Sequence, residues 1–91
     1  MIEYDSDKDA RNVTLRGISL AAVETLLAGP TIERVDSRRS FGETRIIAIG
    51  QIDGIEYVCV YTQRGEVLRA ISLRRANRKE RDAYREAKTG S

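Results

Sequence analysis

The sequence predicts an α+β fold: a small antiparallel sheet of about four strands, with two helices before it and one helix after it. Three strand-like runs, at residues 44–50, 55–62 and 67–74, follow one another with only short turns between them. This spacing predicts a three-stranded antiparallel meander. Helical patterns flank the meander at both ends of the chain. We therefore expect the helices to lie on one face of the sheet.

The first thirty residues predict a short edge strand and two helices. Residues 1–4 form the strand, and either Asp5 or Ser6 can cap a helix that ends at Gly17, where the left-handed conformation is accessible. Ser19 can cap the second helix. The apolar stripe of this helix consists of Leu20, Val23, Leu26 and Leu27. Because these residues recur at helical spacing, the stripe should be buried against the sheet.

The second helix ends at Gly29-Pro30, and the sheet follows. A strand is expected around residues 31–35, and a polar loop that contains Arg38 and Arg39 connects it to the meander. Asp53-Gly54 is a strong signal for a tight hairpin turn between the first two strands of the meander.

Strict alternation along the final strand sorts its side chains onto two faces. The face expected to pack under the helices carries Val67, Arg69, Ile71 and Leu73. The opposite face carries Leu68, Ala70, Ser72 and Arg74. Small side chains on this second face should leave a shallow groove beside Arg74.

The junction between the final strand and the final helix is strongly basic. Asn77 and Glu80 have the spacing of a capping box and mark the start of the helix. The cations at the junction are Arg74, Arg75, Arg78, Lys79 and Arg81. From residue 64 onward the chain has nine basic and four acidic residues, a net charge of +5. This corner can bind the phosphates of a nucleic acid, or it can be a solvated helix face.

Composition excludes several familiar kinds of site. The chain has no histidine and a single cysteine, so neither a Ser-His-Asp arrangement nor a Cys/His zinc site can form. Cys59 lies in a strand among apolar residues and is interpreted as a buried hydrophobe. The N-terminal carboxylates Glu3, Asp5, Asp7 and Asp9 fit a helix N-terminus better than a divalent ion.

Length and hydropathy indicate a single cytoplasmic domain spanning residues 1–91, with a frayed tail at 88–91. No apolar run approaches the roughly 20 residues that a membrane span needs, and no secretory signal is present. We expect no metal and no other cofactor.

Arg, Lys, Tyr and Glu are sufficient to cleave RNA. The 2′-hydroxyl loses a proton and attacks the neighbouring phosphorus, and the 5′-oxygen leaves. Arginines can stabilise the charge on the phosphoryl oxygens. A Lys, Tyr or Glu can move the protons. Since DNA lacks the 2′-hydroxyl, this route is restricted to RNA.

The order of residues resembles the BrnT toxins of type II toxin–antitoxin systems. The opening of that family is matched by Tyr4-Asp5-x-x-Lys8, Asn12 and Gly17-Ile18-Ser19. Its centre is matched by Glu43-x-Arg45, Ile49-Gly50 and Val60-Tyr61-Thr62. Its end is matched by Arg69-x-Ile71-Ser72-x-Arg74-Arg75-Ala76-x-Arg78-x-Glu80-Arg81-x-x-Tyr84.

This resemblance implies a RelE-like ribonuclease that needs no metal and inhibits translation by cutting RNA. It also implies neutralisation by a BrnA antitoxin, whose ribbon-helix-helix part binds operator DNA so that the complex represses its own operon. The family usually has Lys-His-Gly where this chain has Leu15-Arg16-Gly17. Activity can therefore be reduced, and an inactive homologue that binds RNA or protein is the alternative.

Two sets of site residues are expected. The candidate catalytic residues are Lys8, Arg74, Glu80 and Tyr84. The candidate RNA-binding residues are Arg16, Arg69, Arg75, Arg78 and Arg81. Structural roles compete with these functions, because Glu80 can serve the capping box, Tyr84 can pack on the sheet, and Lys8 can be a surface residue. Arg69 can instead pair with an antitoxin.

Overall fold

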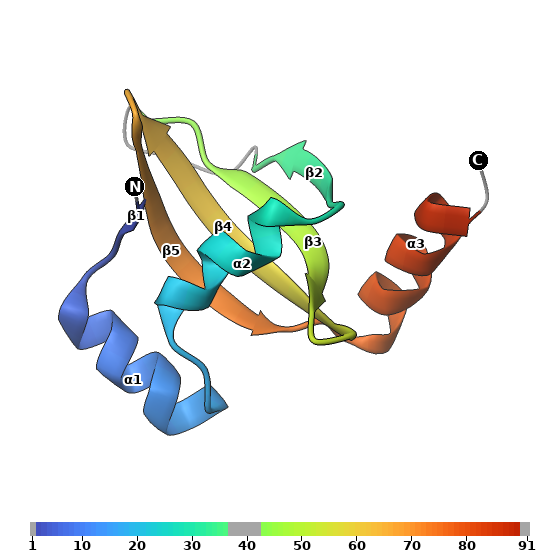
Figure 1. The fold of residues 1–91 in the computed structure, drawn as a ribbon, viewed down its shortest axis with the longest axis horizontal. Helices are drawn as coiled ribbons and strands as arrows, with labels where there is room; N and C mark the ends of the chain where they lie inside the picture. The colour runs from blue at the N-terminus through green and yellow to red at the C-terminus, as the bar shows by residue number, and fades with distance from the viewer. Residues whose placement is uncertain (1, 37–42, 90–91) are drawn as a thin grey trace.

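The computed structural model describes residues 2–36 and 43–89, which form an α+β fold, as expected (Figure 1). The described elements, in chain order, are β1 (Ile2–Glu3), α1 (Ser6–Arg16), the 3₁₀ helix η1 (Leu20–Ala22), α2 (Val23–Ala28), β2 (Ile32–Val35), β3 (Ile46–Ile52), β4 (Ile55–Arg64), β5 (Val67–Arg75) and α3 (Arg78–Thr89). The loop prediction for Arg38 and Arg39 lies outside the described residues.

The sheet has the strand order β1-β5-β4-β3-β2. Strands β2 to β5 pair antiparallel, so the predicted meander is confirmed. The expectation of about four antiparallel strands needs two corrections, because the described sheet has five strands and β1 is parallel to β5. Three helical elements, α1, η1 and α2, follow β1 in the chain before the other strands begin. A connection of this length allows β1 to pair with its neighbour in either the parallel or the antiparallel direction. A two-residue strand carries no pattern that fixes its orientation.

The predicted helix boundaries are confirmed. Asp5 caps α1, because its carboxylate accepts hydrogen bonds from the backbone N–H groups of Asp7 and Lys8. Gly17 ends α1 with a φ of 72°. Ser19 caps η1, which continues into α2.

The core lies between the η1–α2 segment and one face of the sheet, with α2 crossing that face and α1 beside the β5 edge (Figure 1). Its buried members are Leu20, Val23, Leu26, Ala48, Cys59, Ala70 and Leu73. Burial raises the pKa of the Cys59 thiol to about 12, so the thiol is protonated at neutral pH. The interpretation of Cys59 as a buried hydrophobe is thus confirmed.

A β-bulge in β5 changes the predicted faces. Tyr61 pairs with Ala70 and Val60 pairs with Ser72, so Ile71 is an extra residue in the strand. The alternation of side chains between the two faces shifts by one residue at the bulge. Leu68 and Ala70 pack with the core before the bulge, and Leu73 packs with the core after it. The prediction that Arg69 shares the helix-covered face with Leu73, and that Ala70 lies on the opposite face, was wrong. Ser72 and Arg74 do lie on the face away from the core.

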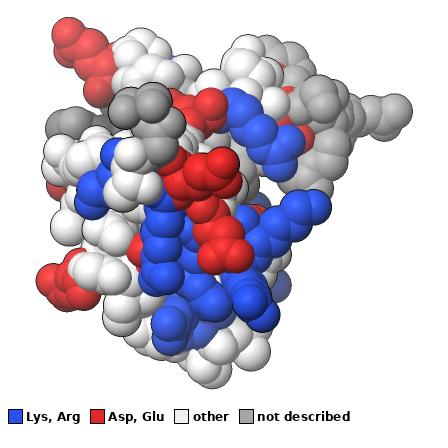
Figure 2. All heavy atoms as spheres, turned by 90° about the vertical axis from the view of Figure 1, so that its right-hand side faces the viewer, with Lys and Arg blue, Asp and Glu red and all other residues white. Residues whose placement is uncertain are grey.

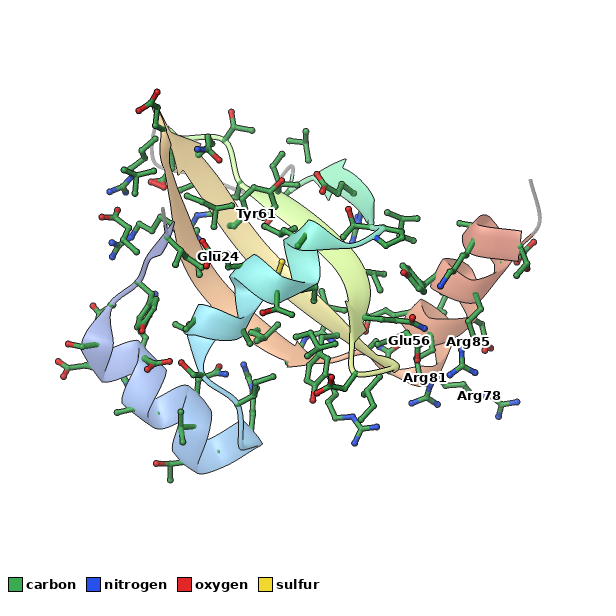
Figure 3. The ribbon with its side chains drawn as sticks, viewed as in Figure 1. Glu24, Glu56, Tyr61, Arg78, Arg81 and Arg85 are labelled. Carbon is green, nitrogen blue, oxygen red and sulfur yellow. The ribbon has the colours of Figure 1, made fainter. Side chains whose placement is uncertain are left out.

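Helix α3 contacts the opposite face of the sheet from α2, which corrects the expectation that all helices share one face. Alternation along β4 places the Glu56 side chain on the other face of the sheet from the core residue Cys59. Arg85 of α3 donates to both carboxylate oxygens of Glu56, at 3.0 and 3.3 Å, and Figure 3 shows the two side chains facing each other. The Tyr84 hydroxyl donates to the Pro30 carbonyl at 2.9 Å. The helix includes residues 88 and 89 of the predicted tail, and residues 90–91 lie outside the described ranges.

The Glu56 carboxylate makes stability depend on pH. Hydrogen bonds from Arg85 and then Gln51 lower the pKa of Glu56 from 4.5 to about 2. A lowered folded-state pKa contributes stability above pH 4.5 that is lost as the pH falls towards 2. We expect Glu56→Gln to cost about 1–3 kcal/mol at pH 7 and to lose less further stability on acidification. Urea denaturation at roughly pH 7, 4 and 3 measures the stability lost at neutral pH and the further loss on acidification.

Glu66→Gln at the exposed β4–β5 turn is the control for that experiment, since it removes the same charge without touching α3. If the free energy of unfolding falls by the same amount on acidification in wild type and in Glu56→Gln, the ion pair contributes nothing to acid sensitivity.

Candidate functional site

The face of the sheet away from the core carries a cavity at the end of β5. The cavity has a volume of about 480 Å³. Its lining consists of Arg34, Asp36, Ile47, Val58, Val60, Ser72, Arg74 and Glu80. Aliphatic side chains from the central strands therefore form the floor, and charged groups from β2, β5 and α3 form the rim.

Arg74 is held in place by Glu80. Its two terminal nitrogens donate to the two carboxylate oxygens at 2.8 Å each. Glu80 also accepts from the Asn77 backbone N–H at 2.8 Å and returns its own N–H to the Asn77 side chain. The predicted capping box is confirmed. A bidentate arrangement fixes the plane of a guanidinium group, so the start of α3 orients Arg74.

The same contact affects proton chemistry. The hydrogen bond from Arg74 lowers the pKa of Glu80 and raises the pKa of Arg74. Glu80 is therefore ionised at neutral pH and is a weaker base than an ordinary glutamate. This environment favours a positioning role for Glu80 over proton transfer.

Arg16 lies on the other side of Ser72. A second cavity, of about 210 Å³, is lined by Lys8, Arg11, Asn12, Leu15, Arg16, Leu20, Ile71 and Ser72. Arg16 donates to the Leu73 carbonyl at 3.3 Å and to the Asn12 side chain at 3.2 Å. Strand β1 pairs with Leu68 and Arg69, near the start of β5. The β5 edge around Leu73 is therefore not covered by β1, and Arg16 of α1 binds there.

The two cavities share Ser72, and together they form a groove across β5. We call this surface the β5 groove. Of the predicted site residues it brings together Lys8, Arg16, Arg74 and Glu80.

Four predicted RNA-binding residues do not line the β5 groove as defined by these two cavities. One is Arg69, which pairs with Glu3 near the start of β5, and the other three lie around the start of α3. Arg75 and Arg78 are exposed, and Arg81 is partly buried. Figure 3 shows Arg78 and Arg81 extending outward from the start of α3. Figure 2 shows basic side chains gathered around this helix, with acidic side chains among them. These cations contribute to the local positive potential rather than to a shared cavity.

Tyr84 is also apart from the β5 groove. Its side chain is only 2% exposed, and its hydroxyl is bound by the Pro30 carbonyl. The ring fixes α3 to the segment between α2 and β2, and Lys88 lies 5.9 Å from the ring centre. The position of Tyr84 favours the packing interpretation.

Two residues of the groove were not assigned by the sequence. Asn12 is buried, and its side chain donates to the Ile18 carbonyl at 2.8 Å and accepts from Arg16. Its spacing of four residues from Arg16 on one helix was an available signal. Arg34 gave no local signal, because it reaches the rim only through the pairing of β2 with β3.

Two further properties concern the described ranges, residues 2–36 and 43–89. No helix there has the length and apolar composition of a membrane span. No three His, Cys, Asp or Glu side chains within those ranges are grouped so that they could hold a metal ion.

Comparison with known families identifies the chain. A family model described as the ribonuclease toxin, BrnT, of type II toxin–antitoxin systems matches residues 4–80. This chain belongs to the BrnT family. A search of curated proteins found no match. The matched range includes Arg16 and Arg74 of the β5 groove, together with Lys8 and Glu80. Membership in this family implies an antitoxin partner.

Proposed function

We propose that this BrnT-family chain is an endoribonuclease that needs no metal ion and binds the scissile phosphate over Ser72, between Arg74 and Arg16. The observation that carries this proposal is the anchoring of both guanidinium groups on either side of one small residue. Each arginine is fixed by protein atoms and still has further N–H donors. Such preorganised donors are suited to a phosphoryl group that gains charge in the transition state.

The reaction we propose starts with loss of the 2′-hydroxyl proton to a base. The 2′-oxygen bonds to phosphorus, the bond from phosphorus to the 5′-oxygen breaks, and the 5′-oxygen takes a proton. The products are a 2′,3′-cyclic phosphate and a 5′-hydroxyl. Lys8 is the groove residue best suited to exchange a proton, because arginine stays protonated and Glu80 is bound by Arg74.

A non-catalytic binding module is the second candidate, and one feature of the groove supports it. Leu15 is 78% exposed at the rim, in the tripeptide where the family usually has Lys-His-Gly. Arg16 can bind a phosphate there but is a poor proton shuttle. In this alternative the chain binds RNA without cutting it.

Purified chain incubated with single-stranded RNA in EDTA separates the two candidates. Cleavage that leaves 2′,3′-cyclic phosphate ends supports the ribonuclease. Binding without cleavage supports the binding module. Cleavage that requires an added divalent ion would contradict the metal-independent mechanism.

The partner we propose is a BrnA-like antitoxin with a ribbon-helix-helix part, and the complex would bind operator DNA and repress its own operon. An apolar cavity of about 470 Å³ shares Arg34 and Glu80 with the β5 groove and suits such a protein partner. Ile32, Ile47 and Ile49 form its floor, and the charged lining residues are two bases, Arg34 and Lys79, and two acids, Glu33 and Glu80. An antitoxin segment with aliphatic side chains and charges of both signs would match this lining. Free toxin in the cytoplasm would then cut RNA and inhibit translation.

A further inference from the structure

A third cavity extends the β5 groove past the bulge. It has a volume of about 220 Å³ and a predominantly polar lining. The lining residues are Asp5, Lys8, Glu43, Arg45, Arg64, Arg69, Ala70 and Ile71. It shares Lys8 and Ile71 with the Arg16 cavity, so the concave surface continues along β5 from Arg74 to Arg69.

The cations of this third cavity are not equally available to a ligand. Arg64 pairs with Glu43 at 2.9 Å and with Glu3 at 3.7 Å. Arg69 pairs with Glu3 at 3.3 Å, through one terminal nitrogen. Because Glu3 is shared by the two arginines, it neutralises neither of them fully.

Arg45 differs from its neighbours. Within the described parts of the chain it makes no ion pair with a carboxylate, and its Nε is shielded from solvent without a hydrogen-bond partner. Arg45 is partly buried just before β3, and it lines the third cavity. An anion bound in this cavity would give its guanidinium group the ion pair that it lacks within the described residues.

We propose that Arg45 and Arg69 form a second phosphate subsite, which binds the RNA backbone at a distance from the scissile phosphate. This inference rests on the proposed RNA cleavage. Arg69 and Arg74 pair with Thr62 and Val58, which are four positions apart on β4, so the two arginines lie about 13 Å apart along the strand. A single RNA strand of several nucleotides spans this distance, with Ile71 offering an apolar surface between the two subsites. The subsite would therefore favour longer RNA strands over shorter ones, without regard to their base sequence.

Binding of non-cleavable RNA with 2′-deoxy residues tests the subsite independently of catalysis. A trinucleotide fills only the Arg74–Arg16 subsite, and an oligonucleotide of about ten residues reaches both. We expect Arg45→Gln to weaken binding of the long probe by about tenfold and to leave the trinucleotide unchanged. The salt dependence of the long probe, as log K against log salt, should become shallower by about 0.7.

Arg78→Gln is the matched control, because it removes the same charge from an exposed position outside the three cavities. If Arg45→Gln does not fold, Arg69→Gln takes its place with the same expected result. Unchanged binding of the long probe, or an equal loss for both probes, would overturn the subsite. Loss of RNA cleavage in Arg74→Ala tests the proposed function separately, so either proposal can fail alone.

Discussion

Arg74→Ala is expected to reduce RNA cleavage by about 100- to 1,000-fold, which is the typical effect of removing one preorganised donor from a developing oxyanion. The loss should fall on the chemical step, because Arg16 still binds the phosphate from the other side of Ser72. Single-turnover cleavage of a defined RNA in EDTA measures this rate directly.

Arg75→Ala is the matched control for that experiment, since it removes the same side chain from the next position but outside the β5 groove. We expect it to change cleavage only slightly. The Arg74–Glu80 ion pair is partly exposed, so its loss should cost at most about 1 kcal/mol of stability. Wild-type cleavage by a folded Arg74→Ala protein would remove Arg74 from the mechanism.

Tyr84→Ala is expected to destabilise the fold by about 3–5 kcal/mol, because it removes a fully buried ring from the contact between α3 and the segment before β2. This is a large fraction of the roughly 5–15 kcal/mol that stabilises a small domain. Chemical denaturation followed by circular dichroism measures the loss.

Tyr84→Phe separates packing from chemistry at the same position. It keeps the ring and deletes only the hydroxyl that binds the Pro30 carbonyl, so we expect a loss of about 1 kcal/mol and wild-type cleavage. The opposite pattern, full stability with abolished cleavage, would restore the catalytic interpretation of Tyr84.

The sequence was most informative where structure depends on neighbouring residues. The cap at Asp5, the end of α1 at Gly17 and the capping box of Asn77 and Glu80 all occur where they were expected. The turn at Asp53-Gly54 has the positive φ angles of 52° and 79° that a tight hairpin needs. Each of these features depends on side-chain chemistry within a few residues, so no tertiary contact is needed to predict it.

Features that depend on pairing between distant strands were not predictable. Nothing in the local sequence places the extra residue of β5 at Ile71, because the bulge is defined by its pairing with Val60 and Tyr61. For the same reason the sequence could not show that Arg74 shares a cavity with Arg34 of a different strand. It grouped the cations at the end of β5 by proximity in the chain, whereas the fold separates Arg74 from Arg78.

The bulge at Ile71 also affects how this protein should be compared with its relatives. A homologue that lacks this one residue would pair the equivalents of Ala70 and Ser72 regularly with the equivalents of Tyr61 and Val60, so every later side chain would keep its face. A homologue that keeps the residue but has no bulge would turn the equivalent of Leu73 towards the groove and the equivalents of Ser72 and Arg74 into the interior. An alignment that places the gap elsewhere in β5 would therefore match residues that never occupy the same environment, however similar they look in one-letter code.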